Sequence, residues 1–144
     1  KNIQSGETNK LINKKIKSAL KSDLKVIFCI GETLQEKRKK ITKKVLNRQI
    51  RLGLNKIINK NKIIIAYEPV WSIGSGLIPK TKDLLETINF IKNKIKKSKV
   101  LYGGSVNPKN ISELKSINNI DGFLIGGASQ HPKKFIDIIK KTYN

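Results

Sequence analysis

The stretch that decides the fold is IIIAYEP, residues 63–69. It opens with an unbroken apolar run, Ile63–Tyr67, and a glutamate and a proline follow directly. A strand with one solvent-exposed face would alternate polar and apolar residues, whereas a short continuous apolar run is typical of a parallel strand buried on both faces. The stretch therefore predicts an interior strand whose carboxyl end carries Glu68.

Three further apolar runs have the same character, at Val26–Ile30, Val100–Tyr102 and Phe123–Ile125. Helical spacing of apolar residues fills the intervals, with helix starts predicted at Thr8, Thr42, Thr81, Asn107-Pro108 and Pro132. This alternation predicts an α/β fold of four parallel strands with right-handed helical crossovers. Both an open doubly wound sheet and part of an eight-stranded barrel satisfy the order, and both bind ligands at the carboxyl ends of strands.

The predicted helices differ in how far they run and which side they bury. The helix from Thr42 is expected to include Ile57–Ile58, and the last helix to turn Phe135, Ile136 and Ile139 inward. No linker or change of composition interrupts the chain, so residues 1–144 are expected to form a single domain.

The net charge is +21, from 31 Lys and Arg against 10 Asp and Glu. Only Arg38, Arg48 and Arg51 are arginines, and the lysines are spread along every predicted helix. Arginine is the residue best suited to bidentate contacts with bases and phosphates, so no specific nucleic-acid binding is expected. No stretch approaches the roughly 20 apolar residues of a membrane span, so no membrane partner is expected. A positive field can still attract a small anionic substrate.

The single cysteine, Cys29, excludes an internal disulfide and fits a reducing compartment. It lies inside an apolar run, so we expect a buried, unreactive thiol rather than a nucleophile.

Glu68 is a candidate proton acceptor because it directly follows a buried strand. The segment after it has stiff flanks around a tip of small residues, which is the pattern of a lid that closes over a site and excludes water. An ion-paired glutamate followed by an ordinary surface loop is the alternative. The predicted lid comprises Pro69, Val70, Trp71, Ser72, Ile73, Gly74, Ser75, Gly76 and Leu77.

Two later strand ends are rich in glycine: residues 102–108 read YGGSVNP, and residues 121–129 read DGFLIGGAS. Glycine allows backbone N–H groups to approach an anion closely. Barrel enzymes build a phosphate clamp from their last two strand ends. The two segments together predict a phosphate-binding site.

These motifs together resemble the triosephosphate isomerase family. Residues 66–76, AYEPVWSIGSG, resemble its catalytic strand and lid, and the two glycine-rich ends resemble its phosphate-gripping segments. Residues 29–33, CIGET, resemble its fifth strand end, and residues 5–8, SGET, the segment before its fourth helix. The likeness runs the length of the chain in order and spacing. It implies the C-terminal half of a TIM (β/α)8 barrel, strands five to eight.

The resemblance implies an isomerase of glycolysis and gluconeogenesis that interconverts dihydroxyacetone phosphate and glyceraldehyde 3-phosphate. Glu68 would be the catalytic base, passing a proton through an enediolate; this family is a standard worked case of a Glu base under a closing loop. The residues implied to bind the substrate phosphate are Gly74, Ser105, Gly126 and Gly127. No metal or organic cofactor is implied.

Other implied roles concern the lid and the assembly. Ile73 and Leu124 would shield the carboxylate from water, and Tyr102 and Ser105 would latch the closed lid. Lys92 is expected to face Asp121. The family likeness also implies a cytoplasmic homodimer when the protein is full length.

Some residues of the family pattern have no counterpart here, namely a first-strand Asn and Lys, an electrophilic His and a Ser-Glu-Arg stretch. The only histidine, His131, follows the last strand and is expected to be a surface residue or cap. We therefore expect the N-terminal half of the barrel, about four strands, to be absent and the chain alone to be inactive. The alternatives are a non-catalytic phosphate-binding half-barrel module, a barrel enzyme of an indole or histidine pathway, and a basic nucleic-acid binder.

Overall fold

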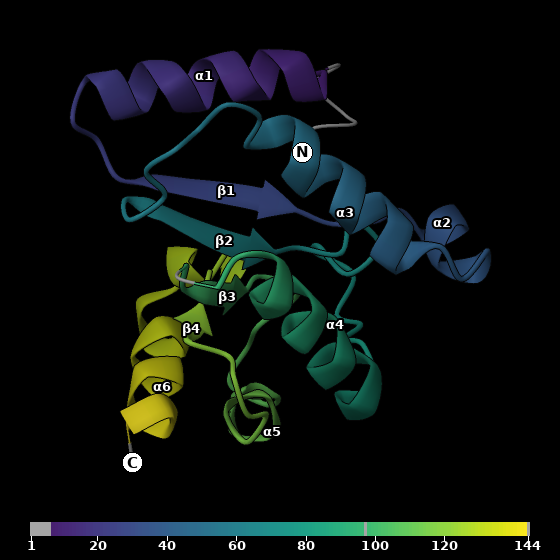
Figure 1. Ribbon diagram of the computed structural model, residues 1–144. Coiled ribbons are helices and arrows are strands. Elements are labelled where there is room, and N and C mark those ends of the chain that lie inside the picture. The colour runs from purple at the N-terminus through teal and green to yellow at the C-terminus, as the bar shows by residue number, and fades with distance from the viewer. Residues whose placement is uncertain (1–6, 97, 144) are drawn as a thin grey trace.

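The computed structural model describes residues 7–96 and 98–143, which contain a four-stranded parallel sheet (Figure 1). The strands are β1 (Val26–Ile30), β2 (Ile63–Tyr67), β3 (Val100–Tyr102) and β4 (Gly122–Phe123), and they lie side by side in chain order. Ile30 is in register with Tyr67, and Tyr67 with Tyr102, so the carboxyl ends of the strands meet at one edge. The predicted α/β fold of four parallel strands alternating with helices is confirmed.

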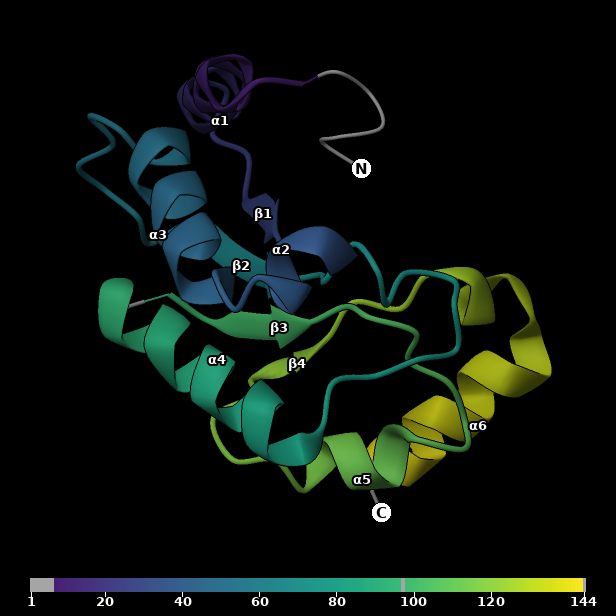
Figure 2. The same ribbon diagram turned by 90° about the vertical axis from the view of Figure 1, so that its right-hand side faces the viewer.

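The helices are α1 (Asn9–Lys21), α2 (Leu34–Arg38), α3 (Thr42–Gly53), α4 (Thr81–Lys94), α5 (Ile111–Lys115) and α6 (Pro132–Tyr143), with a short 3-10 helix η1 (Gly127–Gln130). α1 packs on α3, α3 on α4, and α5 on α6. Figure 2 shows α1, α3 and α4 following one another around the outside of the sheet. In the part of the chain that the structure describes, no helix is long and apolar enough to cross a membrane.

The core lies between this layer of helices and the sheet. The core residues of the strands and of the two longest crossover helices are Phe28, Ile30, Ile63, Ile65, Val100, Leu46, Ile50, Leu84, Ile88 and Ile91, all buried. Close packing of β1 against α3 depends on Gly53, because a Cβ at that position would collide with the Phe28 ring. Packing against the helices therefore holds the sheet in place, and the sheet in turn determines the position of the edge where its strands end.

The prediction that the strands are buried on both faces holds at the carboxyl end of β2, where Ala66 and Tyr67 are both buried, but it is wrong for β1. Ile27 is 48% exposed, and Cys29, Ile64 and Leu101 are only half-buried. These side chains lie on the face of the sheet opposite α3 and α4, where less of the chain covers them. Cys29 is accordingly half-buried instead of fully buried.

Two element boundaries differ from the predictions because local hydrogen bonds redirect the chain. β4 ends at Phe123, although the Leu124 N–H still donates to the Tyr102 carbonyl at 2.9 Å. α5 begins at Ile111, not at Pro108, because a side-chain turn comes first, in which Asn110 Oδ1 accepts from the Asn107 N–H at 2.9 Å.

Other departures concern helix ends. α3 ends at Gly53, before Ile57–Ile58, and Ile58 is 99% exposed. Thr42 and Thr81 are the first helical residues instead of caps. α2 was not predicted; it begins with a capping box in which Glu36 Oε2 accepts from the Thr33 N–H at 2.8 Å.

The inward face of α6 was also predicted wrongly. Phe135, Ile136 and Ile139 are 36%, 51% and 41% exposed, whereas Ile138 is 2% exposed and belongs to the core. The helix is therefore rotated so that Ile138, which directly precedes Ile139 in the chain, points to the core.

Candidate active site

Glu68 lies directly after β2, between the ends of the two neighbouring strands. Its N–H donates to the Ile30 carbonyl at 2.8 Å. After β3 the same bond recurs, because the Gly103 N–H donates to the Tyr67 carbonyl at 2.9 Å. A Cβ on Gly31 would collide with the Glu68 carbonyl, and a Cβ on Gly103 would lie 2.7 Å from Glu68 Cγ. Two glycines thus leave room for the backbone and the side chain of this half-buried glutamate.

A cavity of about 730 Å³ opens at this edge of the sheet. Glu68 lines it together with residues from the lid, from the loop after β3 and from the turn after β4. The lining residues from the predicted site are Glu68, Ile73, Gly74, Gly76, Ser105, Gly126 and Gly127. The structure therefore brings the candidate base, the lid tip and the predicted phosphate-binding residues around one space.

The first half of the lid is anchored to a buried carboxylate that the sequence interpretation did not single out. Glu32 is 1% exposed; its Oε1 accepts from the Trp71 indole N–H at 2.9 Å and its Oε2 from the Tyr67 hydroxyl at 3.1 Å. Burial raises the pKa of the Glu32 carboxyl, and these two hydrogen bonds offset part of that rise. Lys37 of α2 lies 3.5 Å from the centre of the Trp71 ring, a cation–π contact on the outer side of the indole.

The second half of the lid is tied to the loop after β3 by Ser105. The Ser105 hydroxyl accepts from the Gly76 N–H at 3.0 Å and donates to the Ser72 carbonyl. Ser105 has a φ of 47°, a left-handed conformation that is uncommon for a residue with a side chain. The lid in this structure is thus in contact with the loop that also lines the cavity.

The opposite wall of the cavity consists of Gly126 and Gly127, both exposed, at the start of η1. Neither N–H has a hydrogen-bond partner among the described residues, and a Cβ at either position would meet nothing within 4 Å. Backbone N–H groups that are unpaired and exposed at a cavity wall can bind an anion.

Four polar residues that line the cavity were missed by the sequence interpretation as parts of the site. They are Lys109, Gln130, His131 and Lys134. His131 is exposed, as expected, but it also lines the cavity. The only available signal was the position of residues 130–134 directly after the second glycine pair, and it could not show that η1 turns these side chains toward the cavity.

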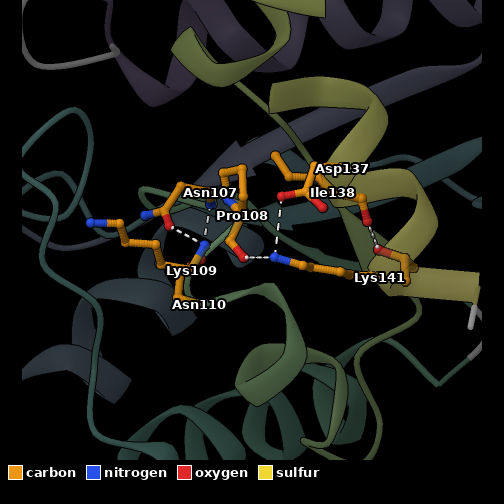
Figure 3. Close-up of polar contacts among 8 residues, drawn as sticks. Asn107, Pro108, Lys109, Asn110, Asp137, Ile138 and Lys141 are labelled. Atoms are coloured by element: carbon orange, nitrogen blue, oxygen red, sulfur yellow. Dashed lines mark hydrogen bonds and ion pairs between the residues drawn. The ribbon is translucent and has the colours of Figure 1, made fainter. Parts of the chain in front are cut away.

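Figure 3 shows how α6 holds the loop after β3 in place. Lys141 Nζ donates to the Pro108 carbonyl at 2.9 Å and pairs with Asp137 at 3.1 Å. Asn107 Oδ1 accepts from the Lys109 N–H at 2.9 Å inside that loop. The loop after β3 and α6, which both contribute residues to the cavity, are therefore joined to each other on the side away from the cavity.

Not every predicted site residue reaches the cavity. Among the described residues that line it, Tyr102 and Leu124 are not found. Tyr102 is buried behind the lid, with its hydroxyl 3.3 Å from Ser72 Oγ, and Leu124 is half-buried after β4. Of the lid, only Ile73, Gly74 and Gly76 line the cavity, whereas Trp71 turns to Glu32.

The expected contact between Lys92 and Asp121 is present, at 2.9 Å from Lys92 Nζ to Asp121 Oδ1. Asp121 Oδ2 also accepts from the Val100 N–H at 2.6 Å, so this carboxylate joins α4 to the amino end of β3. Across the described ranges, no group of three or more His, Cys, Asp or Glu side chains could hold a metal ion.

Comparison with known proteins agrees with this geometry. The family model described as triosephosphate isomerase matches residues 2–142. The chain is 43% identical over 142 residues to the triosephosphate isomerase of Thermodesulfovibrio yellowstonii and 46% identical over 145 residues to that of Dictyoglomus thermophilum. Each match covers 93% of this chain and 58% of the relative, so the chain spans little more than half the length of these relatives.

A solved structure of triosephosphate isomerase from Bartonella henselae has the same fold. It superposes with a TM-score of 0.89 at 33% identity, covering 99% of this chain and 61% of that chain. A family model that matches nearly every residue and a close structural neighbour lead to the same conclusion: the chain belongs to the triosephosphate isomerase family.

Proposed function

We propose that the protein is a triosephosphate isomerase that interconverts dihydroxyacetone phosphate and glyceraldehyde 3-phosphate. The observation that carries this proposal is the shared cavity, in which a carboxylate held between two strand ends faces unpaired backbone amides under a lid. A cavity of about 730 Å³ is ample for a three-carbon phosphate ester.

In this proposal Glu68 is the base. Its carboxylate takes a proton from the hydroxymethyl carbon of dihydroxyacetone phosphate, and the electron pair of that C–H bond forms the double bond of an enediolate. The electron pair of the carbonyl bond moves onto its oxygen, which then takes the proton of the neighbouring hydroxyl group. The same carboxyl group returns its proton to the former carbonyl carbon, and the deprotonated hydroxyl oxygen becomes the aldehyde oxygen. Gly103 supports this role because the space that it leaves lets the Glu68 side chain lie across the end of β3.

Gly126 and Gly127 bind the phosphate through their N–H groups, and Gly74 and Ser105 complete the grip when the lid is down. Lys109 and Lys134 line the same cavity and add positive charge near the phosphate. Ile73, which is 44% exposed in the lid and lines the cavity, excludes water from the carboxylate. Tyr102 and Ser105 act as the latch, and Leu124 supports the wall from behind.

The remaining features of the assembly are part of the same proposal. Residues 1–144 are proposed to form one partial barrel domain that corresponds to strands five to eight. By the resemblance, the group that polarises the substrate carbonyl is a histidine without a counterpart here, and we propose that a complete site takes it from a further segment. The working protein is then a cytoplasmic homodimer.

The experiment follows dihydroxyacetone phosphate by NMR in D2O with the purified protein. It is carried out with this chain alone and after mixing with the part of the Thermodesulfovibrio yellowstonii relative that this chain does not match. We expect deuterium at the substrate carbon and formation of the aldehyde at least in the mixture, and neither with Glu68→Gln.

The same experiment tests the alternative of a non-catalytic phosphate-binding module. That alternative predicts that the substrate binds, which is seen as line broadening of its signals. It also predicts that deuterium is incorporated neither with the chain alone nor in the mixture. Such a result would overturn the proposed function while leaving the phosphate site in place.

A further inference from the structure

Ser72 is completely buried, although residues 73–77, which follow it in the lid, are exposed. Its exposed fraction is 0%, whereas Ile73 and Leu77 are 44% and 61% exposed. A small polar residue at the center of an exposed loop must have its hydrogen bonds satisfied within the protein. Its partners therefore show what this position does.

The backbone of Ser72 is fully engaged. Its N–H donates to the Pro69 carbonyl at 2.8 Å, which closes a turn at the start of the lid. Its carbonyl accepts from the hydroxyls of Ser105 and Ser75, the latter at 3.1 Å. Ser72 thus joins the lid both to its own tip and to the loop after β3.

The side chain of Ser72 connects two further segments. Its Oγ donates to the carbonyl of Leu77, at the far end of the lid, and lies 3.3 Å from the Tyr102 hydroxyl. A serine hydroxyl has one proton. Because that proton is given to Leu77, Tyr102 must be the donor in the second contact, which is long for a hydrogen bond between hydroxyls.

Two observations support a built contact between Ser72 and Tyr102. Burial raises the pKa of Tyr102 to about 12, so its hydroxyl keeps the proton that it donates at any ordinary pH. A Cβ on Gly104 would lie 2.5 Å from both Ser72 Oγ and the Tyr102 hydroxyl oxygen. Only glycine at position 104 leaves room for the two hydroxyls to meet.

We propose that Ser72 is a positioning residue that fastens both ends of the lid to the end of β3, and so holds Ile73 and Gly74 over the cavity. The importance of this position for catalysis rests on the proposed function. The fastening itself is a property of the ligand-free protein and can be measured without any substrate.

The first test is amide hydrogen exchange of Gly76, whose N–H donates to Ser105 Oγ and reports whether the lid is down. Ser72→Ala should speed this exchange by roughly five- to tenfold, the factor expected when one or two hydrogen bonds are lost. The matched control is Ser116→Ala, which removes a similar bond, from a serine hydroxyl to the carbonyl of Glu113 at 2.7 Å, at the end of α5 and outside the lid. The control should leave Gly76 exchange unchanged.

Tyr102→Phe provides a second variant that preserves the ring packing. Because the bond from Ser72 to Leu77 remains in this variant, we expect a smaller increase in Gly76 exchange than with Ser72→Ala. In the double variant, the two changes should not add, since both remove the same contact. Unchanged Gly76 exchange in Ser72→Ala, or strictly additive effects in the double variant, would overturn the proposal.

The second test uses glycerol 3-phosphate as an unreactive probe, with binding followed through the fluorescence of Trp71, the only tryptophan. Ser72→Ala should weaken binding by the same factor by which it opens the lid. If the unaltered protein did not bind glycerol 3-phosphate, the proposed function would fail, and Gly76 exchange would still decide whether Ser72 fastens the lid. If binding were unchanged in Ser72→Ala while exchange rose, Ser72 would fasten a lid that does not grip the ligand, and the positioning role would be rejected.

Discussion

The two walls of the cavity are built in opposite ways. On the carboxylate wall, Glu68 is packed against Gly103, and the lid is bonded to Glu32 and Ser105. On the phosphate wall, Gly126 and Gly127 are exposed, and no atom of the described residues comes within 4 Å of a Cβ added to either glycine. Proton transfer needs a carboxylate fixed within a fraction of an ångström, whereas phosphate binding needs only donors that are free to face an anion. The first wall therefore depends on side-chain packing, and the second on the backbone.

Replacing one glycine by alanine on each wall tests this difference. The resulting loss of kcat on the carboxylate wall should be the largest of the predicted effects. Gly103→Ala places a Cβ 2.7 Å from Glu68 Cγ, so the carboxylate must move. We expect kcat to fall by about a hundredfold, the scale of a misplacement near 1 Å. Gly127→Ala meets open space and should change kcat by less than about twofold.

The measurement is steady-state isomerisation by both variants, each mixed with the part of the Thermodesulfovibrio yellowstonii relative that this chain does not match, with urea unfolding as the check that each is folded. Equal losses of kcat in the two variants would show that the walls do not differ in the way described.

Removing an N–H group from the phosphate wall should have the next largest effect. Gly127 is the first residue of η1, and the first position of a helix is where proline is most often found, because its missing N–H is not needed within the helix. Gly127→Pro should weaken binding of glycerol 3-phosphate by about tenfold or more, the loss expected for one hydrogen bond to a charged group. Titration calorimetry measures it, with Gly127→Ala as the control that keeps the N–H; equal affinity of the two variants would argue against a role for this amide.

The pH dependence of folding stability should show the smallest effect and concerns the carboxylate wall. Burial raises the pKa of Glu32 above its unfolded value, so its contribution to stability is complete below the unfolded pKa and is lost as pH rises through the folded pKa. Glu32→Gln keeps an acceptor for Trp71 and has no charge to bury. The free energy of unfolding of wild type relative to this variant should therefore fall on going from pH 4 to pH 8, by about 1 kcal/mol or less.

Urea titrations followed by Trp71 fluorescence would measure this difference at each pH. A rise of the wild type relative to Glu32→Gln over the same range would mean that the ionised carboxylate is the favoured form, contrary to the stated direction.

The order of the strands and of the long helices, and the edge of the sheet at which the cavity lies, could be predicted from the sequence. The continuous apolar run Ile63–Tyr67 ending on Glu68 and the paired glycines mark the strand ends directly. The lid was predicted from its stiff flanks and small tip, and its contacts with Ser105 appear in the structure. Each of these features is formed by residues close together in the chain, and such local patterns can be recognised in a single sequence.

The features that escaped prediction depend on contacts between distant segments. The burial of Glu32 requires Tyr67 and Trp71 to close over it. The place of His131 and Lys134 at the cavity depends on the turn at η1. The exposure of Phe135 and Ile136 reflects how α6 is rotated against α5, which its amphipathic pattern alone could not fix.

The central claim is that one carboxylate, Glu68, performs the proton transfer while the other wall only binds. The most direct measurement uses Glu68→Asp, which withdraws the carboxylate by one methylene. It compares kcat, measured in the mixture with the unmatched part of the relative, with the affinity for glycerol 3-phosphate. We predict a loss of at least about a hundredfold in kcat, within the range for a displaced general base, with the affinity changed by less than about threefold. An unchanged kcat, or an equal loss in both quantities, would contradict the assignment of Glu68 as the base.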